Sequence, residues 1–143
     1  MGYEITTVDL WFGEVEDRPG ALAEKLEALL RAGANLEFAI MRPSSDVMAG
    51  TSLLFVAPLV GEAQTRAARE VGLDRSTALH ALRIIGPDRP GQVAGIARTL
   101  ADAGIRVCGL WAAAIGDNSV QYLRLESSTD AKRAAQLLAP RLV

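Results

Sequence analysis

The sequence predicts an α+β protein built from two similar lobes, and three observations support this prediction. The tetrapeptide Asp17-Arg18-Pro19-Gly20 recurs as Asp88-Arg89-Pro90-Gly91, 71 positions later and without a gap. Eight of twenty positions match between residues 17–36 and 88–107. Each copy stands between a strand-like and a helix-like segment. A repeat of this length indicates a duplicated domain rather than one turn of a solenoid.

The first half of the chain alternates between strand and helix patterns. Residues 3–15 are rich in β-branched and aromatic side chains, which favours a strand. The first tetrapeptide then leads into a helix that ends at Gly33, where a left-handed backbone costs little. Its apolar stripe at helical spacing consists of Leu22, Leu26, Leu29 and Leu30. Further elements are expected as strands at 35–42 and 51–57, a hairpin loop marked by Pro43–Asp46 and Gly50, and a helix from Pro58 to about Val71.

The second half repeats this plan. A strand is expected at 76–85, and the second tetrapeptide leads into a helix over 90–103 that ends at Gly104. Strands at 105–115 and 120–127 are joined by the turn Gly116-Asp117-Asn118. A last helix is expected after a cap at Ser128 or Thr129.

Two helices on one face of an antiparallel sheet, in the order βαββαβ, form the ferredoxin-like plan. In each half the fourth strand has to be found elsewhere. The first lobe can take it from the front of the long segment 73–85, and the second lobe from Tyr3–Thr7, which extends the first strand of the chain. We therefore expect lobes at 1–74 and 75–143 that exchange edge strands, an arrangement that also removes two exposed sheet edges.

The corner from strand to helix has the chemistry of an anion site. A helix N-terminus presents unsatisfied N–H groups and a partial positive charge, which suit a carboxylate. Gly20 and Gly91 carry no Cβ, so a ligand can approach the backbone closely. Asp17 and Asp88 are placed either to cap the turn or to receive an ammonium group. A purely local role remains an alternative, because tight turns into helices favour these residue types.

The pattern of a strand, Asp-x-Pro-Gly-x-Leu/Val, an amphipathic helix and a glycine resembles the ACT domain, a small-molecule-sensing module of many amino-acid-metabolic enzymes. The resemblance covers both halves of the chain and is closest to small, free-standing tandem ACT proteins. It implies that an amino acid binds at the turn before the first helix of a lobe, often shared with a neighbouring ACT unit. It also implies a homodimer and, as a further partner, a metabolic enzyme in trans.

The family's ligand site can be carried over position by position. In the first lobe the resemblance places it at Asp17, Arg18, Pro19, Gly20, Ala21 and Asn35. In the second lobe it falls on Asp88, Arg89, Pro90, Gly91, Gln92 and Arg106. The family's Asn at the start of the second strand is retained as Asn35 but replaced by Arg106, and Gln92 stands where the first lobe has Ala21. The two sites are therefore expected to differ.

Composition narrows the classes of function. The net charge is −2 and no block of Lys or Arg occurs, so nucleic acid and anionic membranes are not indicated as partners. The single cysteine, Cys108, excludes an internal disulfide and a multi-cysteine metal site. No apolar run approaches the length of a membrane span, and no signal segment precedes the first strand, which indicates a cytoplasmic protein.

No arrangement of nucleophile, base or metal ligands points to catalysis, and no cofactor is expected. His80 is the chain's one histidine, and a triad around it is not indicated. The sequence therefore predicts a non-catalytic regulatory protein that binds an amino acid. The alternative is a dimerising or docking subunit of an enzyme of amino-acid metabolism whose ligand sites are vestigial. An enzyme of the acyl-phosphatase kind is a third possibility, on fold analogy alone.

Overall fold

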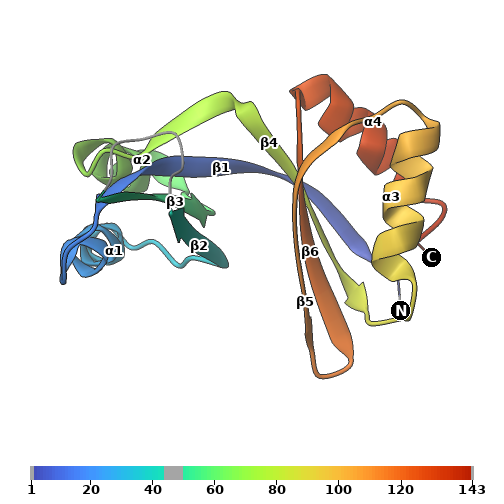
Figure 1. The fold of residues 1–143 in the computed structure, drawn as a ribbon, viewed down its shortest axis with the longest axis horizontal. Helices are drawn as coiled ribbons and strands as arrows, with labels where there is room; N and C mark the ends of the chain where they lie inside the picture. Colours follow the sequence, from blue (N-terminus) through green and yellow to red (C-terminus); the bar gives the residue numbers. More distant parts are fainter. Residues whose placement is uncertain (1, 44–49, 143) are drawn as a thin grey trace. The chain divides into compact units, whose positions relative to one another are not determined.

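A computed structural model describes residues 2–43 and 50–142. The chain forms two compact units, shown in Figure 1. The internal unit consists of residues 9–76, and the terminal unit combines residues 1–8 with 77–143. The expected hairpin residues Ser44, Ser45 and Asp46 lie outside the described part of the chain.

The internal unit contains a sheet with helices α1 and α2 packed against one another. Its strands are hydrogen-bonded in the order β2-β3-β1-β4, and both β1 and β2 are antiparallel to β3. The elements are β1 (Glu4–Glu16), α1 (Ala21–Arg31), β2 (Phe38–Pro43), β3 (Thr51–Ala57) and α2 (Gly61–Glu70), followed by the first residues of β4 (Asp74–Pro87).

The terminal unit repeats this arrangement. Its strands are hydrogen-bonded in the order β1-β4-β6-β5, and β6 is antiparallel to both β4 and β5. Helices α3 and α4 lie side by side on one face of these strands (Figure 1). The elements after β4 are α3 (Gln92–Asp102), β5 (Val107–Ile115), β6 (Asn118–Leu125) and α4 (Ser128–Leu138).

Strands β1 and β4 are long enough to serve both units. Within the terminal unit the Tyr3 hydroxyl donates to the Pro87 carbonyl at 2.6 Å, and its ring occupies the space that a Cβ on Gly86 would need. Within the internal unit Arg75 contacts Asp9 at 3.3 Å. The contact of Tyr3 is near the end of β4 and the contact of Asp9 is near its beginning, so β1 and β4 run antiparallel. Residues 3–7 thus lie in the same compact unit as residues 77–142.

Each unit has its own hydrophobic core between sheet and helices. The internal core gathers around Trp11, Leu29 and Leu54 and includes Ala68 of α2. The terminal core is made of branched side chains from strands and helices, namely Leu82, Ile84, Ile96, Leu100, Leu123, Leu125 and Leu138, with Tyr3 and Ile5 packed against them. Alternate strand residues face these cores, which agrees with the period of two expected of a half-buried sheet.

Three local expectations were wrong. Leu30, placed in the apolar stripe of α1, is 69% exposed, because Leu22, Leu26 and Leu29 already fill the contact with the core. Helix α2 begins at Gly61 rather than Pro58, since Val60 is still extended and its N–H donates to Gln64 Oε1. The last helix is capped by Ser127, whose Oγ accepts from the Asp130 N–H at 3.0 Å.

Candidate functional site

Both corners are built in the same way. The Asp17 N–H donates to the Gly50 carbonyl, and the Asp88 N–H donates to the Asp117 carbonyl, so each corner is tied to the neighbouring hairpin. The N-cap residues of α1 and α3 are Gly20 and Gly91, with φ of 90° and 79°. This left-handed conformation explains the glycine in both copies of the tetrapeptide, because a Cβ would strain it.

Neither helix is capped by a side chain in the part of the chain that the structure describes. Asp17 and Asp88 therefore do not cap these helices, which was one of their two expected roles. In α3 the first intrahelical bond runs from the Gly95 N–H to the Gly91 carbonyl. The N–H groups of Val93 and Ala94 precede that bond, so they belong to the orphan donors of a helix start. Such donors are available to an anion.

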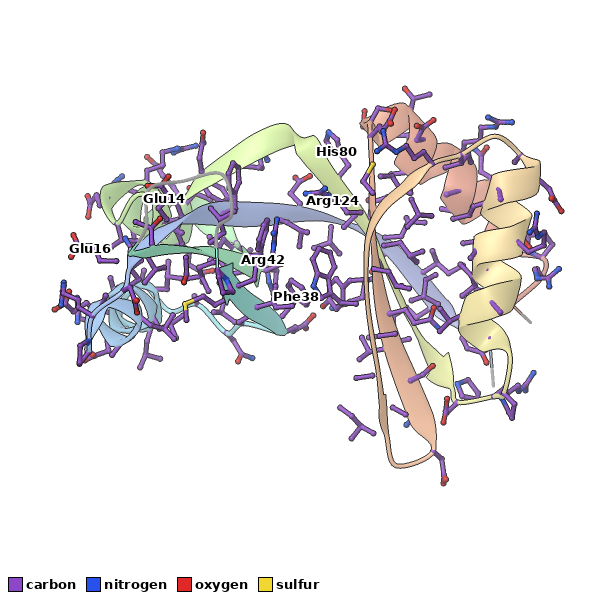
Figure 2. The ribbon with its side chains drawn as sticks, viewed as in Figure 1. Glu14, Glu16, Phe38, Arg42, His80 and Arg124 are labelled. Atoms are coloured by element: carbon purple, nitrogen blue, oxygen red, sulfur yellow. The ribbon has the colours of Figure 1, made fainter. Side chains whose placement is uncertain are left out.

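A cavity of about 400 Å³ opens against this end of α3, wholly within the terminal unit. One wall is formed by the corner and first helical turn, through Asp88, Arg89, Gly91, Gln92, Val93 and Ala94. The other wall comes from β5 and β6, through Ala112, Ala113, Ala114, Ser119 and Gln121. Four of the residues that the sequence predicted for a ligand site thus lie together around one cavity. Neither His80 nor Arg124, both labelled in Figure 2, lines it.

Two buried amide atoms at this cavity have no hydrogen-bond partner among the described residues. They are Nε2 of Gln92, a donor, and Oε1 of Gln121, an acceptor. The Gln121 side chain is buried, with 1% of the residue exposed. A buried polar group without a partner costs about 1–3 kcal/mol, so native proteins rarely keep one without a reason. The two atoms are thus a donor and an acceptor whose partners the described residues do not supply.

Charged groups lie at the mouth of the cavity. Asp88 and Arg89 are both exposed, and the Arg89 guanidinium lies 6.0 Å from the centre of the Tyr3 ring. Tyr3 precedes β1 and thus lies beside one of the residues that line the cavity.

The corner of the internal unit is occupied by its own ion pairs. Arg18 contacts Glu16 at 2.8 Å and Glu24 at 2.7 Å. These hydrogen bonds and charges raise the pKa of Arg18 and lower the pKa of Glu24, in both cases chiefly through the hydrogen bond between them. Glu14 and Glu16 extend from the part of β1 that leads into this corner (Figure 2). The hollow there measures about 240 Å³ and is lined by Glu14, Glu16, Arg18, Ala21, Glu24, Lys25 and Thr51.

The remaining predicted residues are not brought to these hollows. Asn35 is exposed and does not line the hollow at α1. Arg106 extends into solvent and contacts Glu126 at 3.2 Å. Four further predicted residues belong to the corners but line neither hollow, namely Asp17, Pro19, Gly20 and Pro90.

Sequence reasoning missed Gln121 and the three alanines of β5 as residues that line a cavity. Gln121 lies at a core-facing position of β6, two residues before Leu123 and four before Leu125, both of which are buried. Its alternation with the buried Leu123 and Leu125 was the available signal. A glutamine in an apolar row indicates a polar requirement that packing does not explain.

Solved structures share this fold. A protein from Bacteroides thetaiotaomicron matches with a TM-score of 0.76 at 15% identity, over 92% of this chain and 88% of that one. The ligand-free regulatory subunit of aspartate kinase from Thermus thermophilus matches with a TM-score of 0.61 at 16% identity, over 95% of both chains. Aspartate kinase from Synechocystis matches with a TM-score of 0.61 at 19% identity, over 98% of this chain and 26% of that one.

At these identities the likeness shows the fold alone, and it supports an ACT-like fold for this chain. No model of a protein family matches the sequence, and no curated protein does.

Among the described residues no cluster of His, Cys, Asp or Glu could hold a metal ion. None of the described helices has the length and apolar character needed to cross a membrane.

Proposed function

We propose that this protein is a non-catalytic regulatory protein built from two ACT-type, ferredoxin-like lobes, and that it binds a free amino acid. The proposal is carried by one observation, the cavity at the uncapped N-terminus of α3. The strand order of each unit, with two helices packed on the sheet, fits the lobes of this proposal. The regulatory subunits among the structural neighbours favour the same class of function.

The proposed pose follows from the charges around the cavity. The ligand carboxylate lies against the N–H groups of Val93 and Ala94, where the helix dipole favours an anion. Gln92 Nε2 is a further donor for that carboxylate. The ammonium group lies at the mouth, where the Asp88 carboxylate neutralises it. The ligand side chain then extends over the alanines of β5.

This pose makes the terminal unit the ligand-binding one. In the internal unit Arg18 already satisfies Glu16 and Glu24, so an amino acid entering that corner would have to break these contacts. We propose one ligand per chain. Calorimetry should therefore give a stoichiometry near one, and a stoichiometry near two would contradict the proposal.

A screen against the twenty amino acids tests the function directly. A ligand present at 100 times its dissociation constant adds about 2.7 kcal/mol to the free energy of unfolding, which raises the melting temperature measurably. Ala112→Leu fills the cavity from the edge strand β5 and should abolish this rise. Ala39→Leu is the matched control, since it enlarges an exposed alanine of β2 in the internal unit. A wild-type protein that no amino acid stabilises at millimolar concentration would end the proposal.

A second function is favoured by the surface of β5. This strand is the last in the hydrogen-bonded order, and Leu110 and Ile115 on it are 45% and 72% exposed. An apolar edge strand is suited to pairing with another chain. The protein could then act as a dimerising or docking subunit of a metabolic enzyme. Ile115→Lys should weaken self-association in sedimentation experiments if this surface is used, and unchanged sedimentation would exclude it.

A further inference from the structure

Gln121 stands in a row of side chains that otherwise belong to the hydrophobic core of the terminal unit. It is paired across the sheet with Ile84 on β4 and Ala112 on β5, so all three lie on the face that carries helices α3 and α4. Residues farther along the same face of β6 are leucines. The glutamine occurs where the row meets the cavity, which places its amide on the cavity floor.

The atom at issue is an acceptor. Oε1 of Gln121 is buried and has no donor among the described residues, whereas the neighbouring Ser119 hydroxyl donates to the Gly86 carbonyl at 3.4 Å. Gln121 thus lines the cavity beside Ser119 and three alanines of β5, while its buried carbonyl oxygen lacks a hydrogen-bond donor among the described residues. A ligand group that donates a hydrogen bond there removes the free-energy cost of burying that oxygen alone.

We propose that Gln121 selects amino acids whose side chain carries a neutral hydrogen-bond donor, a carboxamide or a hydroxyl. This inference rests on the proposed function, because it assumes that an amino acid occupies the cavity. A cationic side chain is disfavoured, since no carboxylate lies on the floor and a buried charge without a partner is costly. An ionised acidic side chain has no hydrogen to donate to Oε1. An apolar side chain would leave Oε1 buried without a donor.

Isosteric pairs of ligands measure this selection. Asparagine and leucine have similar shapes, as do threonine and valine, and the members of each pair differ in the donor. Calorimetry on the full chain should give at least one donor-bearing ligand that binds about tenfold or more tightly than its apolar isostere, the ratio expected for one good hydrogen bond. The two pairs also distinguish a carboxamide ligand from a hydroxyl ligand.

The variant Gln121→Met keeps the length of the side chain and removes the acceptor. It should reduce the preference within the selected pair to less than threefold, while the melting temperature of the ligand-free protein does not fall. Gln136→Met is the matched control, since this glutamine is exposed on α4 away from the cavity. It should leave the preference unchanged.

The outcomes separate this inference from the function on which it rests. If no amino acid binds the wild-type protein, the proposed function fails and the role of Gln121 fails with it. If amino acids bind but leucine and valine bind as tightly as their isosteres, the inference alone is overturned. The same conclusion follows if Gln121→Met binds ligand with the wild-type preference intact.

Discussion

The two copies of Asp-Arg-Pro-Gly end in different surroundings. In the internal unit Arg18 is held by Glu16 and Glu24. The equivalent positions 71 residues later are Pro87 and Gly95, which offer no carboxylate to Arg89. Arg89 instead lies over the ring of Tyr3. The same four residues therefore form a corner closed by ion pairs in one unit and a corner open to a cavity in the other.

The side chains of the strands that face each corner also differ between the two units. The registers place Leu54 opposite Gly13 and Met41 in the internal unit, where the terminal unit has Gln121 opposite Ile84 and Ala112. Leu54 is 2% exposed and belongs to the core of its unit. The terminal unit thus has the amide of Gln121 beside the small Ala112, where the internal unit has the two large apolar side chains of Leu54 and Met41. The comparison indicates that the corner supplies backbone N–H donors for a ligand, while the side chains of the facing strands determine whether there is a cavity to hold it.

Exchanging the residue on the floor of the internal unit should have the largest effect. Leu54→Gln removes a buried leucine and buries an amide at a position that does not line the hollow at α1, so the free energy of unfolding should fall by roughly 3–5 kcal/mol. Urea denaturation measures this loss. A loss below about 1 kcal/mol would mean that the two floors are interchangeable.

Two glycines test how the long strands serve each unit. A Cβ on Gly13 would meet the carbonyl oxygen of Gly72, which belongs to the backbone, whereas a Cβ on Gly86 would meet the ring of Tyr3, which belongs to a side chain. Gly13→Ala should therefore cost about 2–3 kcal/mol, and Gly86→Ala less. Tyr3→Ala should recover part of the Gly86→Ala loss, because it removes the clashing ring, and should leave the Gly13→Ala loss unchanged. Additive losses for Tyr3→Ala and Gly86→Ala in urea denaturation would show that the two residues are not in contact.

The reverse exchange in the terminal unit should have a smaller effect, of opposite sign. Gln121→Leu replaces a buried acceptor that has no partner with an apolar side chain of similar size, so the ligand-free protein should gain about 1–2 kcal/mol. The same denaturation experiment measures the gain. Destabilisation by Gln121→Leu would indicate that Oε1 is satisfied in solution, and the contrast with Leu54 would lose its energetic basis.

Much of this architecture could be predicted because local patterns specify it. The repeated tetrapeptide located both corners, and Gly33 and Gly104 marked the ends of two helices. The extra length of the first strand led to the prediction that Tyr3–Thr7 is an exchanged segment. The alternation of Gln121 with two leucines marks it as unusual, but its place at the cavity depends on the register that sets it opposite Ala112. The closure of the first corner was equally hidden, because Glu16 and Glu24 meet at Arg18 only after folding.

The ion pairs at the closed corner give the smallest effect, one that a titration resolves. Arg18 holds the pKa of the Glu24 carboxyl below its ordinary value in the folded protein. A folded-state pKa that is depressed contributes stability that is present above the unfolded pKa and is lost as the pH falls through the folded pKa. Carboxyl NMR signals should therefore show Glu24 titrating at lower pH in the wild-type protein than in Arg18→Gln. Equal midpoints would mean that the corner of the internal unit is not closed by this pair in solution, and that an amino acid could compete for Arg18 there.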